Sequence, residues 1–153
     1  GPNKYYDYNE KNLINIFEKI KKILESENLQ AIVLSSMRTP KITIDLADKF
    51  LGNENLVIKD IDKKAYLSGL SLAKYIVVTC DSTSMISEAA LTGKPIYIAE
   101  IPSKKNDDRF KKFRDMFGKM NISKKLDENV EIWSYKSLNE TSRIAKEIKK
   151  KLL

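Results

Sequence analysis

The sequence predicts an α/β fold built on an open parallel sheet with helices on both faces. Segments with helical apolar spacing alternate with short apolar runs along the chain. These runs, such as YIVV and IYIA, are continuously apolar and rich in β-branched residues, which is typical of parallel strands buried on both faces. We expect strands near residues 30–35, 56–59, 75–79 and 96–99.

The first part of the chain predicts two helices, each followed by a strand. A helix is predicted over about residues 10–26 because four apolar residues recur at helical spacing: Leu13, Phe17, Ile20 and Leu24. The run QAIVLSS predicts a buried strand. A second helix begins at Pro40 and stops at Gly52 and Asn53, with three residues turned inward: Ile44, Ala47 and Leu51. The run NLVIKD then predicts a short strand.

The second part continues the alternation. The run KKAYLSGLSLA predicts a helix that Gly69 weakens, and KYIVVTC predicts a strand. The helix that follows is expected to end at Gly93 and Pro95, and PIYIA predicts another strand. A helix over about 106–120 is expected to bury four residues: Phe110, Phe113, Phe117 and Met120. A last helix is predicted over about residues 137–152, with Trp133 and Tyr135 packed beneath it. It turns four residues to one side: Leu138, Ala145, Ile148 and Leu152.

Composition narrows the function classes. The chain has 153 residues, which suits one domain, no histidine and a single cysteine, Cys80. Histidine-dependent triads, bases and metal sites are therefore excluded within this chain. No apolar stretch approaches 18 residues and no signal-peptide pattern is present, so we expect a cytoplasmic protein.

The net charge of +7 comes mostly from lysines that scatter over helix faces. They are interpreted first as solvated surface, and second as a preference for an anionic ligand or an anionic membrane at its inner face. No basic–aromatic pattern or zinc spacing suggests a nucleic acid partner.

The run TCDSTSMISEAALTGKP, residues 79–95, holds the strongest functional signal. Its hydroxyls follow the YIVV strand, and ligands of open parallel sheets gather beyond the carboxyl ends of strands. Asp81, Ser82, Thr83 and Ser84 supply oxygens at a helix start, where free N–H groups and the helix dipole favour a phosphate. The alternative is simple N-capping of that helix.

Glu88 lies four residues after Ser84, so the two share a helix face about 6 Å apart. A diphosphate at the helix start would place an attached ribose near this carboxylate. The alternative is an acid that favours the helix dipole.

Five segments in chain order resemble a known family: GPNKYYDYN, SSMRTP, VTCDSTSMISEAALTGKPIYI, RFKKFRDMF and WSYKSLNETSRIA. They resemble the plant mitochondrial-fission factor and its bacterial relatives, which are regarded as glycosyltransferases of envelope sugars. The stretch around residues 66–101 is also similar to the C-terminal domain of GT-B glycosyltransferases, which has a Rossmann-like open parallel sheet.

The resemblance assigns roles to individual residues. Ser82, Thr83, Ser84 and Met85 match the turn that binds the donor diphosphate, and Glu88 matches the acid that holds the donor ribose. Arg38 in SSMRTP would pair with a phosphate, unless it is a solvated loop arginine before Pro40. Ile61 sits where related enzymes hold the nucleobase.

The resemblance also implies that a first strand, lying in the middle of the sheet, is missing before residues 1–4. These residues resemble the glycine-rich loop that follows that strand. Residues 1–153 would thus form a single nucleotide-sugar-binding domain, a fragment of a longer two-domain protein.

Other charged and aromatic residues have more ordinary interpretations. Asp107 and Asp108 start a helix and either cap it or touch a donor sugar. Three cations lie opposite the phenylalanines of RFKKFRDMF: Arg109, Lys112 and Arg114. They are expected to be solvated, although their face of the helix could meet an anionic acceptor. Cys80 ends a buried strand and is expected to be inert.

Two functions remain open at this point. The first is the donor-binding half of a GT-B glycosyltransferase that uses a nucleoside diphosphate sugar and acts on a cell-envelope acceptor. It would need no cofactor or metal, and no catalytic base is assigned in this chain, which should be inactive without its N-terminal domain. The second is a non-catalytic adaptor that retains the fold, as in mitochondrial fission.

Overall fold

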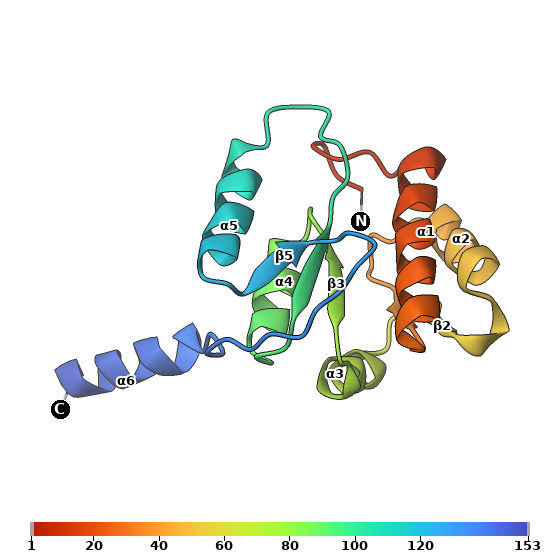
Figure 1. Cartoon of the computed structure of the whole chain (residues 1–153). Helices are drawn as coiled ribbons and strands as arrows, with labels where there is room; N and C mark the ends of the chain where they lie inside the picture. The colour runs from red at the N-terminus through yellow and green to blue at the C-terminus, as the bar shows by residue number, and fades with distance from the viewer. Residues whose placement is uncertain (1, 153) are drawn as a thin grey trace.

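The computed structural model describes residues 2–152, so Gly1 of the segment that resembles a glycine-rich loop lies outside the described residues. Figure 1 shows the arrangement of its elements. They follow one another along the chain as α1 (Glu10–Glu27), β1 (Ile32–Leu34), α2 (Lys41–Leu51), the 3-10 helix η1 (Gly52–Glu54), β2 (Leu56–Ile58), α3 (Lys63–Leu72), β3 (Ile76–Thr79), α4 (Thr83–Ala90), β4 (Ile96–Ala99), α5 (Asp108–Lys119), β5 (Ser123–Lys125) and α6 (Glu140–Leu152).

The strands are parallel, which confirms the predicted α/β class with a Rossmann-like open parallel arrangement. They lie in two sheets: β1 pairs with β2, and β4 pairs with β3 on one side and β5 on the other. All four residues of the central strand β4 are buried, whereas Val77 on the edge strand β3 is 40% exposed. The continuously apolar run IYIA therefore marks the strand that has a neighbour on each side.

The N-terminal helices form a layer beside the two-stranded sheet. In α1, the side chain of Asn9 caps the helix start by accepting a hydrogen bond from the N–H of Asn12, and Asn28 ends the helix in the left-handed region. The apolar face of α1 packs against α2, where the rings of Phe17 and Phe50 stack at 6.4 Å. Both helix predictions for this region are confirmed.

Gly69 has a packing role that its helix-weakening character did not reveal. It is buried on α3, and a Cβ built there would lie 3.0 Å from Cδ1 of Leu34. The missing side chain allows α3 to approach β1 closely.

Helices α4 and α5 contact the three-stranded sheet, α4 through β3 and β4, and α5 through β5. Phe117 is buried, and its ring lies 4.5 Å from that of Phe113, as expected for the apolar face of α5. Met120 was expected to be buried and is 46% exposed. The prediction was wrong because α5 ends at Lys119 and the chain turns at Asn121, which has a φ of 55°.

The region after α5 departs most from the predictions. Strand β5 was not predicted, because two of its three residues are lysines and an edge strand can carry such charges. Trp133 does not lie beneath the last helix: its ring meets that of Tyr97 at 5.2 Å, and its Nε1 donates to the carbonyl of Asn121. Leu138 is anchored by a backbone hydrogen bond to Ala90, but α6 buries none of its described residues.

Candidate functional site

The turn between β3 and α4 lies at the carboxyl end of the three-stranded sheet. The N–H of Ser82 donates to the carbonyl of Thr79 at 3.2 Å, and the N–H of Ile86 donates to the carbonyl of Ser82, which starts α4. Asp81 and Ser82 are buried, Thr83 is half-buried and Ser84 is exposed. The hydroxyls of this turn therefore gather at the start of a helix, where the dipole favours an anion.

The side chain of Ser82 does not cap the helix. Ser82 occupies the N-cap position of α4 but forms no side-chain capping hydrogen bond. The first N–H groups of a helix have no partner within the helix itself.

The buried carboxylate of Asp81 contacts Tyr8 and Arg38. The Tyr8 hydroxyl donates a hydrogen bond to Oδ1 of Asp81, and Nη2 of Arg38 lies 3.7 Å from Oδ2. Burial raises the pKa of Tyr8, and the hydrogen bond to Asp81 raises it further, so this hydroxyl remains a donor. The Asp81 side chain is fully buried, whereas that of Arg38 is 52% exposed. We call these three residues the Arg38 cluster.

The Arg38 cluster joins the ends of two strands that belong to different sheets. Arg38 sits in a tight turn after β1, in which the N–H of Thr39 donates to the carbonyl of Ser36 and the N–H of Ser36 donates to Oγ1 of Thr39. The structure thereby brings the half-exposed guanidinium of Arg38 to the hydroxyl-rich turn after β3.

A second cluster contacts the carbonyl of Cys80, and we call it the Arg114 cluster. The Tyr6 hydroxyl donates to Oδ2 of Asp107 at 2.7 Å, and Nη2 of Arg114 lies 3.2 Å from the same oxygen. Nη1 of Arg114 donates to the Tyr6 hydroxyl at 2.8 Å and to the carbonyl of Cys80 at 3.2 Å. The hydrogen bonds from Tyr6 and Arg114 lower the pKa of Asp107.

Two sequence predictions are corrected by this cluster. Arg114 was expected to be solvated, but its side chain is 14% exposed because it faces Tyr6 and Asp107. Asp107 was expected to cap α5 or touch a donor sugar; it makes no side-chain capping bond, and its carboxylate accepts from Tyr6 and Arg114, while contact with a sugar stays a prediction. Arg109 and Lys112 are exposed, as expected.

The remaining predicted site residues lie along α4 and in the segment after β2. Glu88 is exposed on α4, and Met85 is half-buried against the core. Burial raises the pKa of the Tyr66 hydroxyl on α3, and the Glu88 carboxylate raises it further. Ile61 follows β2 and is 63% exposed.

The tyrosines are the functional neighbours that sequence reasoning missed. Tyr6 and Tyr8 are buried, and they are two residues apart in YYDY, so an extended segment turns both to one side. That spacing, in buried residues with a polar tip, was the available signal. Cys80 is also buried, and burial raises the pKa of its thiol, in keeping with an inert side chain.

The rim is suited to binding an anion. It combines a helix start, three hydroxyls and a half-exposed guanidinium, all of which favour negative charge. Two surface hollows lie elsewhere, on α5 and on α6. Within residues 2–152, no three acidic or cysteine side chains are grouped so as to hold a metal ion, and none of the helices there combines the length and apolarity needed to span a bilayer.

Parallel strands with polar groups at their carboxyl ends place the chain among Rossmann-like α/β proteins. The family model described as mitochondrial fission ELM1 matches residues 1–152, and the chain belongs to this family. An uncharacterized protein of Rickettsia prowazekii is 33% identical over 156 residues, which cover 97% of this chain and 44% of that protein.

The mitochondrial fission protein ELM1 of Arabidopsis thaliana is 32% identical over 120 residues, which cover 76% of this chain and 28% of that protein. The chain thus spans less than half the length of these two relatives. No solved structure matches significantly.

Proposed function

We propose that this chain is the donor-binding part of a GT-B glycosyltransferase that takes a nucleoside diphosphate sugar and acts on a cell-envelope acceptor. The observation that carries the proposal is the position of Arg38, held by Asp81 beside the turn 82–84. A planar guanidinium and a helix start that face the same space are suited to a diphosphate.

The chemistry of this part would be electrostatic. Charge builds on the leaving diphosphate as the sugar is transferred, and the α4 dipole, the hydroxyls of Ser82, Thr83 and Ser84 and the Arg38 guanidinium would stabilise it. Met85 would close the same turn. Glu88 would accept hydrogen bonds from the ribose, and Ile61 would lie toward the base.

The rest of the enzyme would come from a longer protein. The Rickettsia relative is more than twice as long as the segment that this chain matches. In this proposal the general base and the acceptor site would lie in an N-terminal domain of the same protein, and this chain would bind the donor without turning it over.

The Thr83→Asp variant tests the proposal. It adds a negative charge at the first residue of α4, where an acid suits the helix dipole, so the fold should be as stable as the parent or slightly more so. Affinity for a nucleoside diphosphate should fall at least about tenfold through like-charge repulsion. Calorimetric titration with uridine, guanosine, adenosine and thymidine diphosphates measures this.

Thr141→Asp is the matched control, because it makes the same substitution in the first turn of the exposed helix α6. It should leave nucleotide affinity unchanged. Equal affinity of the parent and Thr83→Asp would refute a diphosphate at this turn.

The second candidate is a non-catalytic adaptor. The observation that favours it is the similarity to the Arabidopsis protein, whose name refers to mitochondrial fission. If none of the four diphosphates binds the parent chain, the donor-binding proposal fails and the adaptor is favoured.

A further inference from the structure

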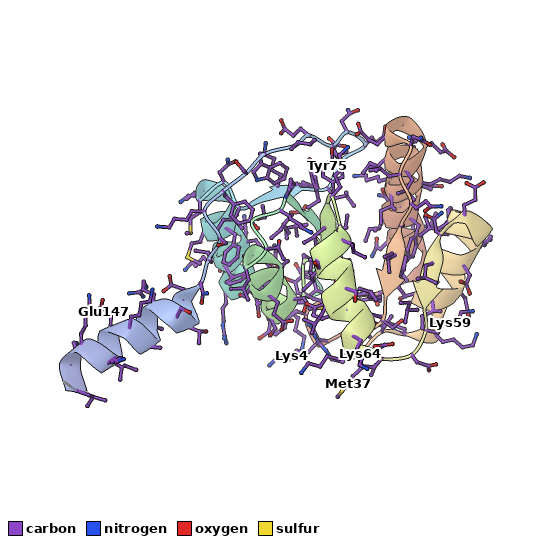
Figure 2. The ribbon with its side chains drawn as sticks, turned by 90° about the horizontal axis from the view of Figure 1, so that it is seen from below. Lys4, Met37, Lys59, Lys64, Tyr75 and Glu147 are labelled. Atoms are coloured by element: carbon purple, nitrogen blue, oxygen red, sulfur yellow. The ribbon has the colours of Figure 1, made fainter. Side chains whose placement is uncertain are left out.

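Helix α6 is the one amphipathic helix among the described elements that buries none of its residues. Its three large aliphatic side chains are exposed: Ile144 by 49%, Ile148 by 52% and Leu152 by 79%. Figures 1 and 2, seen from perpendicular directions, both show the helix standing clear of the body of the molecule, with Glu147 labelled on it in Figure 2.

The comparison with α1 shows that an amphipathic sequence does not by itself leave a helix uncovered. Helix α1 also separates apolar from charged residues, and its apolar face is buried in the core: Leu13, Ile16, Phe17 and Ile23. In α6 the corresponding face has no covering element in the described part of the chain. An exposed apolar stripe of this kind indicates a binding surface.

The apolar stripe is narrow and is flanked by charged residues, with a lysine on each side. Ile144, Ile148 and Leu152 are spaced by four residues, so at about 100° per residue they lie within about 80° of one another around the helix. On the same wheel Lys151 lies about 20° beyond the Ile144 border and Lys149 about 60° beyond the Leu152 border, while Glu140 and Glu147 lie about 40° and 60° beyond the Ile144 border. Long lysine side chains in such positions can reach a charged surface while the aliphatic residues enter an apolar one.

The net positive charge of α6 indicates which kind of surface it would bind. It carries five cations and two carboxylates, of which Arg143 pairs with Glu140 and Lys150 with Glu147. Lys146, Lys149 and Lys151 add to an excess of positive charge. A basic face beside an aliphatic stripe complements a surface that is anionic outside and apolar beneath, which describes an anionic lipid bilayer.

We propose that α6 binds in the plane of an anionic membrane surface, with Ile144, Ile148 and Leu152 in the acyl boundary and the lysines among the headgroups. The helix has 13 residues and is about 20 Å long, which is too short to cross a hydrocarbon core of about 30 Å. It therefore lies on the membrane. The proposal does not depend on nucleotide binding at the β3–α4 turn.

Vesicle co-sedimentation of the whole chain tests the proposal. The parent should bind vesicles of phosphatidylcholine mixed with phosphatidylglycerol, bind pure phosphatidylcholine vesicles at least about tenfold more weakly, and lose affinity as salt is raised. Ile144→Ser combined with Ile148→Ser, and separately Lys149→Glu combined with Lys151→Glu, should each reduce binding to the mixed vesicles at least about tenfold.

The control is Lys111→Glu combined with Lys112→Glu, which makes the same charge change on exposed positions of α5 and should bind within about twofold of the parent. The two α6 variants should unfold at the temperature of the parent because α6 buries none of its residues, and the α5 control should do so because Lys111 and Lys112 are exposed. The proposal is overturned if the parent ignores anionic vesicles, if the serine variant binds as the parent does, or if the α5 control loses binding equally. If the parent ignores anionic vesicles and copies of the chain associate tightly with one another, the stripe is assigned to a protein partner.

Discussion

The Arg38 and Arg114 clusters are built from the same three residue types and differ in where the arginine ends. Each joins a tyrosine of the N-terminal segment, an acid and an arginine around the end of β3. The Arg114 side chain is 14% exposed and donates to three oxygens, whereas that of Arg38 is 52% exposed and lies 3.7 Å from one carboxylate oxygen. The donors of Arg114 are taken up by contacts within the fold, whereas half of the Arg38 side chain remains accessible.

This difference separates a nearly buried arginine from a half-exposed one at the same rim. A buried arginine with satisfied donors contributes to stability mainly because its removal leaves its acceptors unpaired. A half-exposed arginine contributes little to stability, because water screens its pairing. The two clusters therefore predict opposite results for substitutions of the same residue type.

Arg114→Met should give the largest loss of stability, about 3 kcal/mol in the free energy of unfolding. The substitution retains the aliphatic volume and leaves Asp107 and the carbonyl of Cys80 without their cation. Denaturant unfolding measures the loss. Arg109→Met is the matched control, since Arg109 is exposed on the same helix, and it should change stability by less than about 0.5 kcal/mol. Equal effects of the two substitutions would break the comparison.

Asp107→Asn should make the stability of the folded protein less sensitive to acid pH. The pKa of Asp107 is lowered in the folded protein from an ordinary value of 3.8, so its contribution to stability is present above that value and is lost as the pH falls through the lowered one. The parent should therefore exceed the variant in stability near neutral pH, and the gap should close below about pH 4. A constant gap, measured by unfolding from neutral to acid pH, would mean that the ionised carboxylate is not what stabilises the cluster.

Arg38→Gln should have the smallest effect on stability, about 1 kcal/mol or less, because the pair is half-exposed. Its effect on ligands should be larger: nucleoside diphosphate affinity should fall about tenfold or more with loss of a charged donor. Unfolding and calorimetric titration of the same sample measure both quantities. A stability loss as large as that of Arg114→Met, with unchanged affinity, would make Arg38 a structural residue.

Local pattern predicted most elements, because apolar spacing reports the face that a helix or strand buries. It predicted α1 through Leu13 and Phe17 and β4 through IYIA. It missed β5, whose lysines resemble loop residues, and it could not show that α6 would remain uncovered. Periodicity identifies an apolar face without identifying what covers it.

The candidate site was predicted only in part, for a related reason. The position of turn 82–84 and of Arg38 follows from the rule that strand ends share a rim. The partners of these residues do not, since Tyr8 meets Asp81 across 73 positions and Tyr6 meets Arg114 across 108. Nothing local in DST or in RFKKFRDMF indicates a tyrosine near the other end of the chain.

Those long separations have a consequence for how the molecule is made. Closing a loop of this size has an entropic cost that must be met before the contact contributes, so such contacts form late in folding. As the chain leaves the ribosome, Tyr6 must wait until Arg114 has emerged before its cluster can close. The rim that carries the two clusters is thus completed only after about three quarters of the 153 residues have been synthesised, and Tyr6 stays open to proteases until then.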